Sequence, residues 1–153
     1  MLGGARGPSS APSASVLPVS ERLRVAAVIE RDGRILMIRE RVQTAPDRHD
    51  GPKYWMLPGG GTDPGEDPSV AVARKVAEEV GLRATYVEEV ARVPYPSGFT
   101  TVFKVDVADG EPRLGNDDLP CLCPRMVGLD WVERPALSPR HGGSPVPLLV
   151  YAW

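Results

Sequence analysis

Runs of apolar residues, each bounded by polar or turn-forming residues, predict a domain of several short strands and one helix. Two apolar runs at 23–30 and 34–40 are joined by Arg31-Asp32-Gly33, and the Asp-Gly pair favours a tight hairpin turn. Further strands are predicted by short apolar or alternating stretches at 54–57, 85–93, 99–107 and 127–132. The polar stretches at 41–53 and 109–126 are predicted to be loops.

A helix is predicted over residues 68–80. Asp67 can cap its first turn, Pro68 suits the first helical position, and Gly81 can adopt the left-handed conformation that ends a helix. At 100° per residue, the apolar side chains fall on one arc and the charged ones on the other. The first arc is predicted to pack on a sheet and contains Val70, Ala73, Val76, Ala77 and Val80. The second is predicted to face a site or water and contains Arg74, Lys75, Glu78 and Glu79.

The 153 residues suit a single domain with one hydrophobic core. Residues 1–19 are mostly Gly, Ser, Ala and Pro, so residues 1–20 are expected to form a disordered tail and 21–153 the folded domain. The C-terminal part contains four prolines and ends in an apolar segment, 148–153, which is expected to pack against the body. Strands before and after a central helix predict an α/β fold with a mixed sheet.

Composition and charge exclude several classes of protein. A formal net charge of −2 argues against broad nucleic-acid binding, which needs a surplus of Lys and Arg. No apolar run approaches the roughly 20 residues that cross a bilayer, and the N-terminus lacks the apolar core of a signal peptide. Cys121 and Cys123 are too close together for an ordinary disulfide and have no neighbouring zinc ligands. They are interpreted as reduced structural thiols of a cytoplasmic protein.

Residues 57–82, LPGGGTDPGEDPSVAVARKVAEEVGL, resemble the Nudix box of the Nudix hydrolase family. That box reads glycine, five residues, glutamate, seven residues, and then Arg-Glu-aliphatic-any-Glu-Glu-any-Gly-aliphatic. Eight of its nine fixed positions are matched at the family's spacing, by Gly60, Glu66, Arg74, Val76, Glu78, Glu79, Gly81 and Leu82. The ninth position holds Lys75, where the family has glutamate.

The resemblance implies a Nudix-type α/β/α sandwich with a mixed β-sheet. It implies a hydrolase that cleaves a pyrophosphate bond in a nucleoside diphosphate linked to another group. It also implies Mg²⁺ or Mn²⁺ as the cofactor, because a divalent ion neutralises the phosphate charge and orients the attacking water. The expected partner is a small nucleotide-type substrate, and a homodimer is a common assembly in the family.

Roles for individual residues follow from the same resemblance. Glu78 and Glu79 are the expected metal ligands and, with Arg74, the expected catalytic residues. Arg74 is expected to tie the helix to the glycine loop through Glu66. The glycine loop consists of Gly59, Gly60 and Gly61. Because these residues lack side chains, the loop backbone is expected to lie close to the metal and the substrate.

Lys75 changes the local charge by two units relative to the family's glutamate. At about 4 Å and an effective dielectric near 20, one unit interaction is worth about 4 kcal/mol, which is an upper bound for a long side chain that can swing into water. Metal affinity is therefore expected to be lower than is usual in the family. Lys75 is also expected to pair with Glu78 and Glu79 on the same helix.

Other residues have two readings each. A further acid for the site could come from Asp117, Asp118 or Asp130, and each is equally a turn or surface residue. Trp55 is the candidate for stacking on a substrate base, as are the other rings of Tyr54, Tyr95 and Phe99, although core packing is the favoured reading for any one of them. His49 is expected to be exposed in its polar loop.

Two other classes of function compete with the hydrolase. Lys75 favours a nucleotide- or sugar-binding sensor that retains the fold and has lost turnover. An interaction protein that uses only the scaffold is supported by the Pro-rich ends of the chain and by little else.

Overall fold

The computed structural model describes residues 22–95, 98–116, 123–133 and 140–146. The side chains of Arg22 and Tyr95 are outside this description. The predictions for the N-terminal tail, Asp117, Asp118, Cys121 and the apolar C-terminal segment fall outside the described residues.

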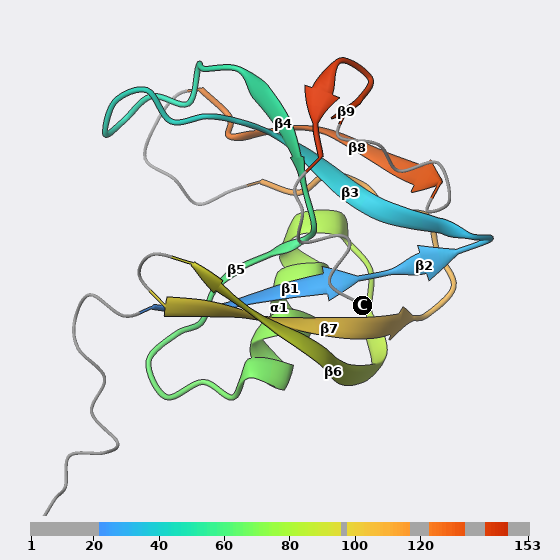
Figure 1. Ribbon diagram of the computed structural model, residues 1–153. Helices are drawn as coiled ribbons and strands as arrows, with labels where there is room; N and C mark the ends of the chain where they lie inside the picture. The colour runs from blue at the N-terminus through green and yellow to red at the C-terminus, as the bar shows by residue number, and fades with distance from the viewer. Residues whose placement is uncertain (1–21, 96–97, 117–122, 134–139, 147–153) are drawn as a thin grey trace, which may run out of the picture.

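The first sheet contains the strands that support the site (Figure 1). Its order is β5 (Gly59–Gly61), β1 (Arg22–Val28), β7 (Gly98–Val107) and β6 (Ala84–Tyr95). β1 and β7 are parallel, whereas β5 pairs with β1 and β6 pairs with β7 in antiparallel fashion. The sheet is therefore mixed, as the sequence predicted.

The second sheet is built around β3 (Arg34–Arg41). β3 pairs with β2 (Glu30–Arg31), β4 (Lys53–Met56) and β8 (Met126–Glu133), all antiparallel. A short hairpin of β9 (Arg140–His141) and β10 (Ser144–Pro145) lies beside β4 (Figure 1). This hairpin and β5 were not predicted, because three glycines and a Gly-Pro-rich stretch carry little strand signal.

The predicted hairpin at Asp32-Gly33 is confirmed, but the predicted strand 23–30 is shared between the two sheets. β1 ends at Val28, and after Ile29 the chain enters the second sheet as β2. Asp32 and Gly33 have φ values of 53° and 76°. Positive φ at both central residues is the geometry of the tight turn that an Asp-Gly pair favours.

The helix α1 (Pro68–Val80) has the predicted bounds. The side chain of Asp67 accepts a hydrogen bond from the Ser69 N–H at 2.8 Å, and Pro68 occupies the first position. Gly81 ends the helix in the left-handed conformation with φ 68°. These end signals act between residues close in sequence, which is why they can be interpreted without the tertiary fold.

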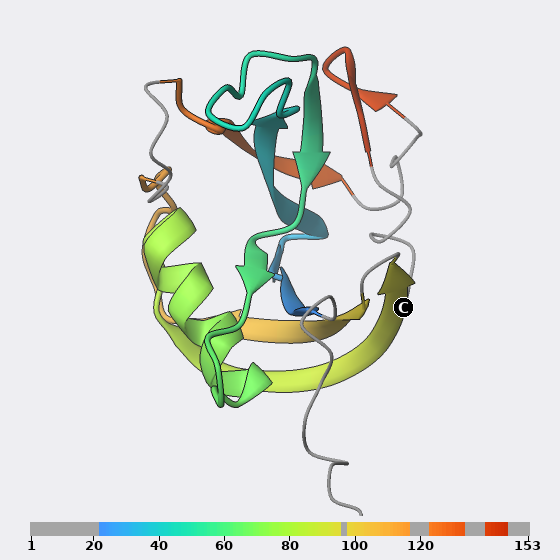
Figure 2. The ribbon, with the colours of Figure 1, turned by 90° about the vertical axis from the view of Figure 1, so that its left-hand side faces the viewer.

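The predicted faces of α1 are wrong in part. Val70 is 58% exposed and Ala77 is also exposed, whereas the buried residues are Ala71, Val72, Val76, Glu79 and Val80. The helix is rotated relative to the predicted arc, so that Glu79 points inward and Lys75 is only partly exposed. Figure 2 shows α1 on one side of the molecule, against the curved β6–β7 pair.

Apolar residues of β1 and β3 are buried on both faces of the sheets, in two clusters. Val25, Ala27, Leu36 and Ile38 belong to the cluster that contains the buried residues of α1. Their alternate neighbours Ala26, Val28, Ile35 and Met37 belong to the other cluster, with Trp55 and Val132. Burial on both faces explains why these strands appear as continuous apolar runs rather than alternating ones.

Candidate active site

The glycine loop forms β5 and lies directly against β1. Ala26 is opposite Gly59 in this ladder, and the Ala27 N–H donates to the Pro58 carbonyl at 2.8 Å. A Cβ placed on Gly59 would lie 2.0 Å from the Val25 carbonyl oxygen. Only glycine permits this close approach of the two strands, which holds the loop at a fixed position under α1.

Glu79 joins α1 to the glycine loop. Its residue is 4% exposed, and one carboxylate oxygen accepts a hydrogen bond from the Gly59 N–H at 2.8 Å. Burial raises the pKa of the Glu79 carboxyl, whereas the Gly59 N–H and the nearby cations Arg125 and Lys75 oppose that rise. These partners hold Glu79 in a buried position, whereas the sequence predicted that its arc of the helix faces a site or water.

Arg125 and Glu40, which sequence reasoning missed, and Tyr54, which it named only as a candidate for stacking, form a chain of contacts on the other side of Glu79. The Arg125 guanidinium lies 3.4 Å from the second oxygen of Glu79 and 3.9 Å from Glu40. The Tyr54 hydroxyl donates to Glu40 at 2.9 Å, and burial beside Glu40 raises the pKa of Tyr54 to about 12. These contacts join residues far apart in sequence. The only hint was a charged residue, Glu40, ending an apolar strand.

Arg74 connects the helix to the turn after the glycine loop, through the predicted contact with Glu66. Its guanidinium donates to both carboxylate oxygens of Glu66, at 2.9 and 2.8 Å. Glu66 also accepts from the Asp63 N–H at 2.9 Å. The paired hydrogen bonds from Arg74, with that of the Asp63 N–H, lower the pKa of Glu66 to about 2. This clamp fixes the start of α1 relative to β5.

Glu78 is the accessible member of the acidic pair, with 43% of its side chain exposed. Both of its oxygens lie 3.2 Å from the Arg74 guanidinium. The predicted Lys75–Glu78 pair is present at 3.9 Å. Glu79 instead bonds to Gly59 and Arg125, so the predicted Lys75–Glu79 ion pair is not among the contacts of the described residues.

The donors in this site fit a divalent ion that arrives with its substrate better than a metal centre of the free protein. No cluster of three or more His, Cys, Asp or Glu side chains suited to a metal occurs among the described residues. Glu78 and Glu79 nevertheless supply two hard oxygen donors from adjacent positions of α1. Mg²⁺ is commonly held by one or two carboxylates together with waters and substrate phosphates, so this pair suffices for such an ion.

Several other candidates lie outside this cluster. Trp55 is 5% exposed and donates to the His141 carbonyl at 2.7 Å, so it lies in the core, the position that the sequence favoured for these rings over stacking on a base. His49 was expected to be exposed but is only 8% exposed, and its backbone N–H donates to Cys123. Asp130 contacts His141 at 3.0 Å rather than the acids of α1. Phe99 lies under the Arg92 guanidinium, at 5.3 Å.

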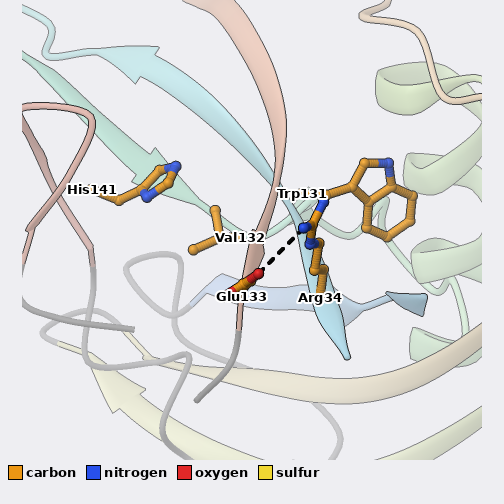
Figure 3. Close-up of a pocket in the computed structure, with 5 residues that line it drawn as sticks. All are labelled: Arg34, Trp131, Val132, Glu133 and His141. Carbon is orange, nitrogen blue, oxygen red and sulfur yellow. Dashed lines mark hydrogen bonds and ion pairs between the residues drawn. The ribbon is translucent and has the colours of Figure 1, made fainter. Parts of the chain in front are cut away.

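A separate hollow of about 300 Å³ lies at the β3–β8 edge (Figure 3). It is lined by Arg34, Trp131, Val132, Glu133 and His141. Arg34 bonds to Glu133 at 3.2 Å, and Trp131 and His141 lie on opposite sides of β8. None of these residues belongs to the Nudix box, so the hollow is not part of the Gly59–Glu79 site.

Comparison with known proteins establishes the family of the chain. The model of the NUDIX domain family matches residues 20–145, and the chain therefore belongs to the Nudix family. A solved structure of the MutT NUDIX hydrolase from Burkholderia pseudomallei superimposes with a TM-score of 0.65 and 27% sequence identity. That match covers 86% of this chain and 93% of the other. The predicted α+β fold with a mixed sheet is thus confirmed.

Curated relatives match over a shorter region. The CTP pyrophosphohydrolase of Escherichia coli (strain K12) is 40% identical over 67 residues, which cover 44% of this chain and 46% of the relative. The RNA pyrophosphohydrolase of Erythrobacter litoralis (strain HTCC2594) is 39% identical over 66 residues, 42% of this chain and 40% of the relative. The chain thus matches less than half the length of these relatives. Within the described residues, no helix has the length and apolar character needed to cross a membrane.

Proposed function

We propose that this protein is a pyrophosphohydrolase that cleaves a nucleoside diphosphate linked to another group, with the help of Mg²⁺ or Mn²⁺. Membership of the Nudix family supports a reaction at a diphosphate, and the two relatives described above are named for pyrophosphohydrolysis. In this reaction, the oxygen of water bonds to one phosphorus. The bond from that phosphorus to the bridging oxygen breaks, and the bridging oxygen leaves with the other phosphate.

The observation that carries this proposal is the double attachment of α1, once to the glycine loop and once to the turn that follows it. Glu79 holds Gly59 at 2.8 Å, and Arg74 holds Glu66 through two hydrogen bonds. Together they fix the acidic pair relative to the loop backbone, so that little rearrangement is needed when a substrate binds. Fixed positions of this kind account for much of the rate gain in reactions where the protein mainly orients its reactants.

Glu78 and Glu79 would hold the divalent ion. When bound, such an ion neutralises phosphate charge and orients the attacking water. Glu78 is the more accessible of the two, and Arg74 keeps its carboxylate directed along the helix surface. Glu79 would supply an oxygen donor from the buried side of α1, while its hydrogen bond with Gly59 keeps the loop in position. Arg125 and Arg74 each balance one member of this pair in the free protein.

Turnover of a panel of nucleoside-diphosphate compounds, with Mg²⁺ or Mn²⁺, tests this function. The double variant Glu78→Gln/Glu79→Gln is expected to lose activity on any compound that the parent hydrolyses. The chain supplies a matched control in Glu88 and Glu89, a second adjacent acidic pair that lies exposed on β6. Glu88→Gln/Glu89→Gln should retain activity. Loss in both double variants, or in neither, contradicts the proposed site.

A sensor that binds nucleotides or sugars without cleaving them is the second candidate. It is favoured by the ammonium of Lys75, which stands in the acidic patch where the family has a carboxylate. Tight binding of one compound of the panel, with no turnover under any metal condition, would establish this function instead. A cytoplasmic location and a homodimer remain predictions. The dimer can be measured by sedimentation.

A further inference from the structure

Lys75 lies over the glycine loop rather than in solvent. Only 22% of its side chain is exposed. A Cβ placed on Gly60 would lie 3.2 Å from Cε and 3.3 Å from Nζ of Lys75, so the ammonium occupies the space directly beside the loop backbone. The absence of a side chain at Gly60 thus leaves room for the end of the lysine side chain.

Within the part of the chain that the structure describes, the hydrogen-bond donors of this ammonium are not used up. Among the described residues, its one ion-pair partner is Glu78, at 3.9 Å, which is too long for a hydrogen bond. Glu78 is instead held by Arg74 at 3.2 Å, and Glu79 by Gly59 and Arg125. Lys75 therefore has hydrogen-bond donors that Glu78 and Glu79 do not occupy, and it lies next to the backbone of Gly60.

We propose that Lys75 binds a phosphate oxygen of the ligand and takes the place of a divalent ion there, so that a diphosphate binds this protein without metal. The inference rests on the proposed function for the class of ligand, because a diphosphate is the anion that the site would receive. An ammonium binds phosphate oxygens as a point charge, and its partial burial beside Gly60 strengthens that attraction.

Binding in the presence of EDTA tests the proposal. The probe is the αβ-methylene analogue of ADP, whose P–C–P link cannot be hydrolysed, and binding is measured by titration calorimetry. The parent is expected to bind it without metal. Lys75→Met keeps the apolar stem and should weaken binding by about tenfold or more, the loss expected when a hydrogen bond between charged groups is removed. Lys75→Arg keeps the charge and should stay within a few-fold of the parent.

Lys104 provides the matched control. It is an exposed lysine on β7 whose neighbours Phe103 and Val105 face α1, so its own side chain lies on the opposite face of the sheet. Lys104→Met should leave binding unchanged. Methylenediphosphonate, which lacks a base and a sugar, should show the same order of affinities if the contact is made to the diphosphate.

The results that overturn the inference are distinct from those that overturn the function. No binding of either probe by the parent in EDTA overturns it, as does equal binding by the parent and Lys75→Met. Equal weakening by Lys104→Met also overturns it, because the effect would then be one of general charge. Metal-free binding through Lys75 with no turnover of any compound supports the inference and overturns the hydrolase. Turnover of a compound by a parent that does not bind the probes in EDTA supports the hydrolase and overturns the inference.

Discussion

Replacing Gly59 by alanine is the sharpest test of how the glycine loop is held. The added Cβ would lie 2.0 Å from the Val25 carbonyl oxygen and 2.9 Å from the Ala26 Cα. Since a carbon and a carbonyl oxygen in close contact stand about 3.3 Å apart, β5 must move from β1 by roughly 1 Å. That shift also loosens the hydrogen bond between Gly59 and Glu79, which is 2.8 Å long in the parent.

Overpacking costs about 1–3 kcal/mol, and a hydrogen bond to a charged group contributes about 1.5–3 kcal/mol. Because the two losses overlap, Gly59→Ala is expected to lower the free energy of unfolding by about 3 kcal/mol. For a chain of this size, that corresponds to a melting temperature lower by about 10 °C. Urea unfolding in EDTA measures the loss without any contribution from bound metal.

Gly61 offers the control within the same strand. It lies in β5 like Gly59, but a Cβ added to it meets no atom within 4 Å. Gly61→Ala should therefore change the free energy of unfolding by no more than about 0.5 kcal/mol. If the two alanine variants unfold at the same urea concentration, the close packing of β5 on β1 does not hold the loop, and the reasoning is refuted.

Three further predictions concern the clamp, the helix face and the tail. Glu66→Gln should be less stable than the parent at pH 7. Folding lowers the pKa of Glu66 to about 2, so the stability that its charge contributes is present above about pH 4.5 and is lost as the pH falls towards 2. Urea unfolding at several pH values in this range should show the difference between the two proteins disappearing. Val70→Glu should change the free energy of unfolding by no more than about 0.5 kcal/mol, whereas Val76→Ala should lower it by about 2 kcal/mol, as measured by urea unfolding. Equal losses would mean that Val70 is buried like Val76, as the sequence predicted. Deleting residues 1–19 should shift the melting temperature by no more than about 2 °C in calorimetry, and a larger drop would mean that they pack on the body.

The bounds of α1 could be predicted from sequence, and its orientation could not. Asp67 and Gly81 act on backbone groups one turn away, so their effect does not depend on the rest of the fold. Orientation depends on which sheet residues the helix meets. Val70 and Ala77 are apolar but exposed, whereas Glu79 is charged but buried, because Gly59 provides it with an N–H donor. Apolar periodicity contains no information about such a partner.

The spacing of the Nudix box was visible in the sequence, but the surroundings of its acids were not. Arg125 contacts Glu79 and Glu40, at 3.4 and 3.9 Å, from positions distant in the chain. Arg125 and Glu40 each look like an ordinary surface charge in their own segments. The contact of Lys75 with the glycine loop was also not predictable, because only the folded structure brings Gly60 beneath it.

The two acidic pairs of this chain show how the fold decides what a short motif does. Glu78 and Glu79 are adjacent on a helix, so their side chains diverge by about 100°. One is therefore exposed beside Arg74, while the other is buried against the loop. Glu88 and Glu89 are the same dipeptide on a strand, and both are exposed. In the first pair, the buried acid positions the loop in addition to its proposed role towards the ion, and the exposed acid is the more accessible to a ligand. This division of roles arises because α1 packs on the glycine strand β5, which supplies an N–H donor to the buried acid. The second pair lies on the strand β6, where both side chains are exposed.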